Sequence, residues 1–180
     1  MIEMYKVDKF TKKNFLKIVI GGEGGVGKTS LSKRLTGKLR EEEILVMTPG
    51  IDFYHLKIKN TILNCIISDL GGQEQFRNFQ NDFFDGASIV ILVFAVDTYF
   101  SYKKISSWFE LLPSQMKNNI FLVGNKIDNS DRSVSMEEAF EFAEQKGLKY
   151  YEISTKNGMG FDHFKEDLIK TIEEIFKLRS

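Results

Sequence analysis

Residues 19–31 have the sequence VIGGEGGVGKTSL, which places five glycines and one lysine between two apolar runs. The part from Gly22 to Thr29 fits the spacing G-x-x-x-x-G-K-[ST]. Glycine leaves the backbone N–H groups of such a loop unobstructed and tolerates the positive φ angles that a tight wrap requires. A helix that follows the loop points the positive end of its dipole at the same anion. A glycine-rich turn with a solvent-exposed lysine is the simpler alternative, but the motif leaves an apolar strand and enters a helix, as phosphate binding requires. The stretch therefore predicts a phosphate-binding loop between a strand and a helix.

Apolar runs and amphipathic segments alternate along the rest of the chain. Residues 88–96 (SIVILVFAV) and 120–125 (IFLVGN) are nearly all apolar, which is typical of strands buried on both faces of a sheet. Residues 51–59 and 61–69 alternate apolar and polar side chains, which predicts an antiparallel hairpin. We expect further strands at 15–21 and 148–154, a short helix that ends at about residue 84, and helices at 28–39, 101–117, 136–146 (with Ser135 as N-cap and Gly147 as the stop) and 161–178. This order predicts an α/β fold with a mostly parallel six-stranded sheet, one antiparallel strand and about five helices on both faces.

Length and composition favour one soluble domain. The chain has 180 residues, and its 25 basic and 25 acidic side chains leave no net charge to support general binding of nucleic acid or of anionic membranes. Cys65 is the only cysteine, so no intramolecular disulfide can form, and a cytoplasmic location fits best. No apolar run approaches the roughly 20 residues of a membrane span, and we expect no intrinsic membrane anchor. We expect residues 1–14 to be an N-terminal extension and residues 15–180 to be the domain.

Two short segments after predicted strands suit the recognition of a nucleotide base. Asn125, Lys126 and Asp128 follow the apolar run IFLVG (120–124), although an ordinary Asn-Lys turn at the end of a strand is the simpler alternative. A carboxylate there can accept two hydrogen bonds from the N1–H and 2-amino group of guanine, whereas adenine has no such pair of donors. Ser154-Thr155-Lys156, after the last strand, can add a second wall to the pocket, although an ordinary strand-to-helix loop would also fit.

Residues after the hairpin suit the phosphate end of a nucleotide. Asp69, at the end of the second hairpin strand, can hold a magnesium ion through a water molecule. Gly72 can offer its N–H to a γ-phosphate, and Gln73 can orient an attacking water. Thr48, in the preceding loop, can supply a hydroxyl to magnesium. A capping role for Asp69 and a solvent-exposed loop position for Gln73 are the simpler alternatives.

Taken together, the motifs GGEGGVGKT, TPGIDF, DLGGQE, NKID and STK make the chain resemble a small GTPase of the Ras superfamily, from Phe15 onward. TPGIDF and QEQFRNF are most similar to Rab proteins, and the pair Gly71-Gly72 is similar to Arf and Gα proteins. The resemblance implies the P-loop NTPase G domain as the fold. It also implies a GTP-binding molecular switch that hydrolyses GTP to GDP slowly, with Mg²⁺ as cofactor and with two loops that respond to the nucleotide.

The resemblance also implies a set of site residues and partners. Gln73 and Lys28 would be catalytic, and Thr29, Thr48 and Asp69 (through water) would serve the metal. The nucleotide would be bound by Glu23, Gly24, Gly25, Val26, Gly27, Lys28, Thr29, Ser30, Thr48, Gly72, Asn125, Lys126, Asp128, Ser154, Thr155 and Lys156. We expect a monomer that binds effectors, exchange factors and GTPase-activating proteins, and whose recruitment to membranes would depend on partners.

Two other classes of function share the glycine loop. A metabolic phosphotransferase would need a second substrate pocket under a lid, and the connections after each strand are too short for one. A module that binds GTP without hydrolysing it remains an alternative, and the presence of Gln73 is only weak evidence against it.

Overall fold

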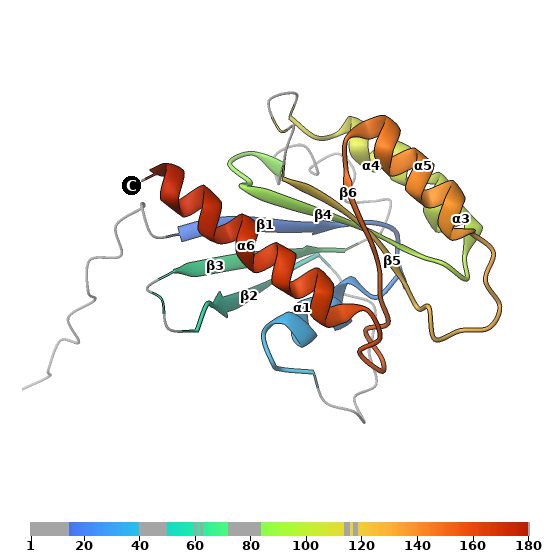
Figure 1. Ribbon diagram of the computed structural model, residues 1–180, viewed down its shortest axis with the longest axis horizontal. Helices are drawn as coiled ribbons and strands as arrows, with labels where there is room; N and C mark the ends of the chain where they lie inside the picture. The colour runs from blue at the N-terminus through green and yellow to red at the C-terminus, as the bar shows by residue number, and fades with distance from the viewer. Residues whose placement is uncertain are drawn as a thin grey trace, which may run out of the picture.

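The computed structural model describes residues 15–39, 50–59, 61, 63–71, 84–113, 116 and 119–179. Six strands within these ranges form one sheet in the order β2-β3-β1-β4-β5-β6 (Figure 1). Every neighbouring pair is parallel except β2 and β3, which are antiparallel. The strands are β1 (Phe15–Gly21), β2 (Ile51–Lys57), β3 (Asn64–Leu70), β4 (Ile89–Ala95), β5 (Ile120–Asn125) and β6 (Lys149–Glu152). The predicted sheet, with its single antiparallel strand, is confirmed.

The central strand β4 is buried on both faces of the sheet. Its side chains alternate between two apolar cores: Ile91 and Val93 lie in one, and Leu92 and Phe94 lie in the other. A strand that contributes to two cores must be apolar at every position, which explains the uninterrupted apolar run at 89–96.

Helices cover both faces of this sheet. α1 (Lys28–Leu35) and α6 (Phe161–Arg179) contribute to the core that contains Ile91, and α6 crosses in front of the sheet in Figure 1. The core that contains Leu92 is covered by α3 (Tyr99–Lys103), α4 (Ile105–Glu110) and α5 (Met136–Lys146). None of the helices in the described ranges combines the length and the apolar character that a membrane span requires.

Two helices differ in extent from the sequence-based expectation. α1 ends at Leu35 instead of continuing to 39, because Gly37 adopts a φ of 69°, a conformation that terminates helices. The helix expected at 101–117 consists of the two short helices α3 and α4 and ends before Pro113. A residue that precedes proline is restricted against helical angles, which accounts for this earlier end. The predicted cap of α5 is confirmed, since the Glu138 N–H donates to Ser135 Oγ at 3.1 Å.

The parallel strands bring the candidate motifs to one edge of the sheet. Ile20 of β1 pairs with Asp69 of β3, Ala95 of β4 pairs with Asn125 of β5, and Gly124 of β5 pairs with Glu152 of β6. The glycine loop and the segments that follow β3, β4, β5 and β6 therefore begin side by side. Ligands of open α/β sheets bind at this carboxyl edge.

Candidate nucleotide-binding site

The glycine loop connects β1 directly to α1, as the sequence predicts. Gly22 and Gly27 have φ angles of 139° and 99°, which disfavour other residues. A Cβ atom on Gly22 would lie 2.1 Å from the Val93 carbonyl oxygen, and one on Gly27 would lie 2.2 Å from Nδ2 of Asn125. These two positions therefore require glycine both for their backbone angles and for lack of space.

Lys28 is the first residue of α1 and is only 6% exposed. Its Nζ donates to the main-chain oxygen of Glu23 at 2.7 Å, so the side chain folds back along the glycine loop. Burial lowers the pKa of the Lys28 ammonium to about 8, although the negative charges of Asp69 and Glu23 favour its charged form. A buried cation placed along backbone N–H groups suits a strongly anionic ligand such as a chain of phosphates.

Asp69 and Thr29 meet beside this lysine. Thr29 Oγ1 donates to Asp69 Oδ2 at 2.5 Å, and Asp69 is fully buried at the end of β3. The other carboxylate oxygen, Oδ1, is buried and has no hydrogen-bond partner among the described residues. Burial raises the pKa of Asp69 to about 6, against the opposing effects of the Thr29 hydrogen bond and the Lys28 charge. An unsatisfied buried carboxylate oxygen next to a hydroxyl offers ligands of the kind that Mg²⁺ prefers.

The side chain of Asn125 joins the glycine loop to the loop after β6. Its Nδ2 donates to the Val26 carbonyl oxygen at 2.8 Å and to Thr155 Oγ1 at 3.2 Å. Its Oδ1 accepts from the Thr155 N–H at 3.0 Å. Asn125 is 1% exposed, so these bonds also satisfy an amide that burial would otherwise leave without partners. Asn125 and Val26 are 99 residues apart in the chain, and one side chain fixes the separation between their loops.

Ser154 and Asp128 connect the loops after β5 and β6. Ser154 Oγ donates to Asp128 Oδ1 at 2.6 Å and accepts from the N–H groups of Lys156 and Asn157, each at 3.2 Å. Lys156 Nζ lies 3.8 Å from Asp128 Oδ2. The carboxylate of Asp128 is therefore oriented by the neighbouring loop, with its second oxygen near the exposed ammonium of Lys156.

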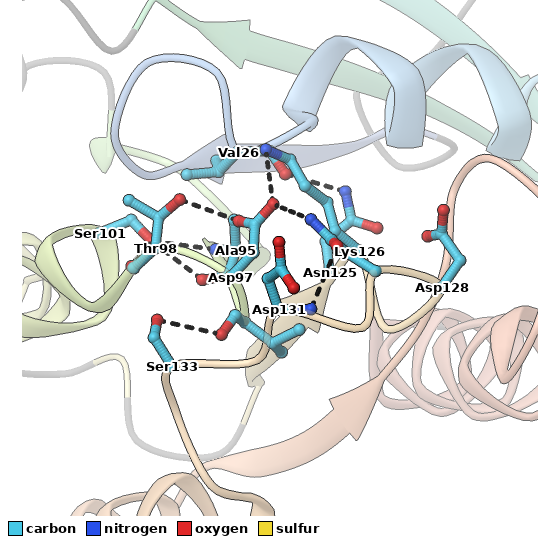
Figure 2. Close-up of polar contacts among 12 residues, drawn as sticks. Val26, Ala95, Asp97, Thr98, Ser101, Asn125, Lys126, Asp128, Asp131 and Ser133 are labelled. Atoms are coloured by element: carbon cyan, nitrogen blue, oxygen red, sulfur yellow. Dashed lines mark hydrogen bonds and ion pairs between the residues drawn. The ribbon is translucent and has the colours of Figure 1, made fainter.

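Figure 2 shows that Asp97, which follows β4, lies against Lys126. Asp97 Oδ2 lies 3.6 Å from Lys126 Nζ and accepts from Asn129 Nδ2 at 3.1 Å. Burial alone would raise the pKa of Asp97, but hydrogen bonds from Thr98 and Asn129 and the charge of Lys126 lower it overall. Sequence reasoning did not select Asp97, although it follows a buried strand at the same edge as the other motifs. The rule that located Asn125 would have found it.

Two further residues that the sequence analysis missed reach the site from helices. Trp108 of α4 donates from Nε1 to Glu23 Oε1 at 3.1 Å. Arg34 of α1 contacts the main chain of the loop that contains Thr155. Neither contact has a sequence signal, because each joins residues that are distant in the chain and depends on how the helices pack.

The structure places most of the predicted site residues together at this edge. The glycine loop, Lys28, Thr29 and Asp69 form one end, and Asn125, Lys126, Asp128 and the segment 154–156 form the other. Ser30 is buried in α1, directly behind the loop. Thr48, Gly72 and Gln73 lie outside the described residues, so their roles stay predictions.

The chain resembles known proteins over most of its length. The sequence pattern of the Ras family matches residues 17–174. The Ras-related protein Rab-18-B of Danio rerio is 36% identical over 165 residues, which cover 87% of this chain and 78% of that protein. Rab-18 of Lymnaea stagnalis is 36% identical over 162 residues (87% of this chain, 80% of that protein). Rab-21 of Mus musculus is 35% identical over 162 residues (88% and 73%).

Proposed function

The chain belongs to the Ras family and is a GTP-binding switch that hydrolyses GTP to GDP, and we propose which of its residues perform each part of this function. It is Rab-like, and proteins of this kind act in regulation or trafficking. We take residues 15–180 as the GTPase domain and residues 1–14 as an extension to it, with support from the family match at 17–174.

The glycine loop and the start of α1 bind the phosphates in this proposal. Backbone N–H groups from Glu23 to Ser30 surround the anion, and the N-terminal end of α1 adds its dipole. Lys28 exchanges its bond to the Glu23 carbonyl for contacts with the β- and γ-phosphates. The low exposure of Lys28 strengthens this attraction, because little water screens it.

Thr29 and Asp69 fit a magnesium ion at the same end. Thr29 would hold the ion through its hydroxyl, Asp69 through a water molecule, and Thr48 through a second hydroxyl. The unpartnered Oδ1 of Asp69 supports this assignment, since the described part of the protein leaves it without a hydrogen bond. Bound Mg²⁺ supplies positive charge that offsets the charge of the phosphate oxygens.

The guanine base binds between the loops after β5 and β6. Asp128 accepts from the N1–H and 2-amino group, and Ser154 holds that carboxylate in place at 2.6 Å. Asn125 and Thr155 line the adjoining wall, while the hydrocarbon parts of Lys126 and Lys156 cover the faces of the base. The ion pair between Lys126 and Asp97 keeps the first of these lysines at the site.

Gln73 orients the attacking water, and Thr48 and Gly72 contact the γ-phosphate. Loss of that phosphate releases both loops, which is how effectors distinguish the two nucleotide states. No arginine stands directly before Thr48, so we propose that a GTPase-activating protein supplies one. Without such an arginine, hydrolysis is slower by roughly 10³–10⁵-fold. Exchange factors and effectors complete the expected set of partners for a monomeric domain.

The observation that carries this proposal is the position of Asn125, which bridges the phosphate loop at Val26 and the base loop at Thr155. It brings both halves of a nucleotide site into one hydrogen-bonded unit. The test is to strip the purified protein of nucleotide and reload it with fluorescent GDP, GTP and ATP analogues, with and without Mg²⁺. We expect retention of GDP and GTP but not ATP; failure to take up either guanine nucleotide would refute the proposal.

Substitution of Asp128 tests the base assignment separately. Asp128→Asn replaces one acceptor by a donor, so we expect weaker GDP binding and improved binding of xanthosine diphosphate, which has a carbonyl where guanine has an amino group. The matched control is Asp131→Asn, which makes the same charge change in the same loop (Figure 2) and should leave selectivity unchanged. Full GTP-over-ATP selectivity in Asp128→Asn would argue against Asp128.

Substitution of Gln73 tests the hydrolytic step. Gln73→Leu should lower the rate of GTP hydrolysis and leave GTP affinity unchanged, because leucine has a similar size but cannot orient a water molecule by hydrogen bonding. Single-turnover hydrolysis of preloaded GTP gives the rate, and displacement of a fluorescent analogue gives the affinity. The comparison is Gln80→Leu, which makes the same change seven positions further along the chain. Equal hydrolysis rates in the two variants would remove Gln73 from the mechanism.

A further inference from the structure

Arg34, in the last turn of α1, donates to two successive carbonyl oxygens of the loop after β6. Nε donates to the Thr155 oxygen at 2.7 Å, and Nη2 donates to the Lys156 oxygen at 2.8 Å. The proposed function places both Thr155 and Lys156 against the guanine base. Because a guanidinium donates in a rigid planar fork, two bonds in parallel fix the orientation of a peptide as well as its distance.

The surroundings of Arg34 hold this fork in place. The guanidinium carbon lies 5.6 Å from the centre of the Phe161 ring, within the range of a cation–π contact. A Cβ atom on Gly158 would lie 3.3 Å from Nη1, so the loop passes closely over the guanidinium. A lysine at position 34 could reach one carbonyl oxygen but could not reproduce both bonds and the stacking.

Arg34 provides the second of two side-chain hydrogen bonds to the backbone of Thr155. The N–H of Thr155 donates to Asn125 Oδ1 at 3.0 Å from the side of β5, whereas the carbonyl accepts from Arg34 on the side of α1. The segment is thus held at its N–H by the sheet and at its carbonyl by the helix. Loss of the second attachment leaves the loop tethered through β5 and its own internal bonds.

The helix that carries Arg34 also carries the phosphate end of the site. Thr29, in the first turn of α1, bonds to Asp69, and Arg34 lies in the last turn of the same eight-residue helix. We propose that Arg34 is a positioning residue for guanine recognition: it sets the base loop at a fixed distance from the phosphate-binding helix and thereby slows nucleotide release. This inference rests on the proposed function, which places guanine against residues 154–156.

The test compares the rate of GDP dissociation from the unsubstituted protein with the rates from Arg34 variants, each used as the full chain and loaded with fluorescent GDP. Arg34→Lys and Arg34→Gln each keep at most one of the two bonds, and we expect the dissociation rate constant to rise roughly tenfold. Both replacements are good helix formers at a half-buried site, and thermal unfolding checks that each variant is folded. Arg179→Lys is the matched control, because Arg179 also donates to a main-chain oxygen, that of Phe15, but at the opposite end of β1.

A second comparison separates positioning of the base loop from general loosening of α1. In an Asp128→Asn background the main base contact is weakened, so the effect of Arg34→Lys should fall to roughly twofold or less. An equal fold-increase in both backgrounds would overturn the proposal, because Arg34 would then act through the phosphates. So would a dissociation rate in Arg34→Lys and Arg34→Gln equal to that of Arg179→Lys. Failure of the unsubstituted protein to retain GDP would instead refute the proposed function itself.

Discussion

The hydroxyl of Thr29 lies 2.5 Å from Oδ2 of Asp69, and this hydrogen bond joins the start of α1 to the end of β3. The two residues come from segments 40 positions apart in the chain. The bond uses one carboxylate oxygen and leaves the other buried without a partner in the described part of the structure. Thr29 and Asp69 are therefore bonded to each other, but one oxygen of the Asp69 carboxylate still lacks a partner. A bound cation would provide one.

Asp69→Asn should remove most of the effect of Mg²⁺ on nucleotide retention. The amide can still accept from Thr29 but carries no charge for the hydrated ion. GDP dissociation measured with Mg²⁺ and with a chelator should differ strongly in the unsubstituted protein and little in the variant. Asp52→Asn is the matched control, since Asp52 pairs with Asp69 across the sheet but is exposed. An undiminished Mg²⁺ effect in Asp69→Asn would exclude this residue from the metal site.

The raised pKa of Asp69 predicts how the stability of the metal-free protein depends on pH. The folded-state value of about 6 lies above the usual 3.8, so the protonated carboxyl stabilises the fold at low pH, and this stabilisation is lost as the pH rises through 6. At neutral pH Asp69→Asn should therefore stabilise the metal-free protein, by at most about 3 kcal/mol. Denaturant unfolding at pH 5 and pH 7.5 measures this. A variant that is less stable at pH 7.5 would show that the carboxylate is satisfied without metal.

Lys28 predicts a second pH dependence, at the alkaline end. Its pKa of about 8 in the free site means that the ammonium loses its proton near this pH, whereas bound phosphates favour the charged form. GDP affinity should therefore fall as the pH rises through about 8, with uptake of a proton on binding. Calorimetry at pH 8 in two buffers of different ionisation enthalpy detects that proton. Binding heats that are equal in both buffers would contradict this role of Lys28.

Gly27→Ala should disrupt the site more than another glycine substitution at a positive φ. The new Cβ atom would meet Asn125 Nδ2 and displace its bonds to Val26 and Thr155. Gly37→Ala is the control, because Gly37 also has a positive φ but has open space around its Cβ position. We expect a loss of about 1–2 kcal/mol of stability from the backbone strain in Gly37→Ala. Gly27→Ala should lose that amount and about 1 kcal/mol more for each broken hydrogen bond; equal losses in denaturant unfolding would contradict the argument.

The order of the elements could be predicted because β4 is apolar at every position, β5 is apolar up to its last residue, Asn125, and the glycine loop marks one strand-to-helix junction. The ends of the helices were harder to predict from the sequence. Gly37 and Pro113 both carry the signals that end a helix, but the apolar spacing continues past each of them and favoured longer helices. Local backbone preference decided the end in both cases.

The candidate site could be predicted where a residue directly follows or ends a strand, as Asp69 and Asn125 do. The contacts between helices and loops could not be predicted from the sequence. Arg34 and Trp108 reach the site only because α1 and α4 pack on opposite faces of the sheet beside its carboxyl edge. Nothing in the sequence indicates which main-chain oxygen or carboxylate each side chain meets.

Trp108 should report the state of the glycine loop by its fluorescence. It is the only tryptophan in the sequence, it is 3% exposed, and its Nε1 donates to Glu23 Oε1 at 3.1 Å. The main-chain oxygen of the same Glu23 accepts from Lys28, so a phosphate that draws Lys28 away changes the surroundings of the indole. We therefore expect the emission of the stripped protein to change in intensity or wavelength when GDP is added.

Substitution of either partner in the hydrogen bond between Trp108 and Glu23 tests this interpretation. Glu23→Gln keeps an acceptor oxygen and should preserve the bond, but it removes the carboxylate charge and should reduce the change in emission. Trp108→Phe keeps most of the buried ring area against Gly21 and loses the N–H donor, so GDP dissociation should rise by a few-fold, in line with about 1 kcal/mol for one hydrogen bond. Emission that is identical with and without GDP, together with unchanged dissociation in Trp108→Phe, would show that this contact supports packing of α4 alone.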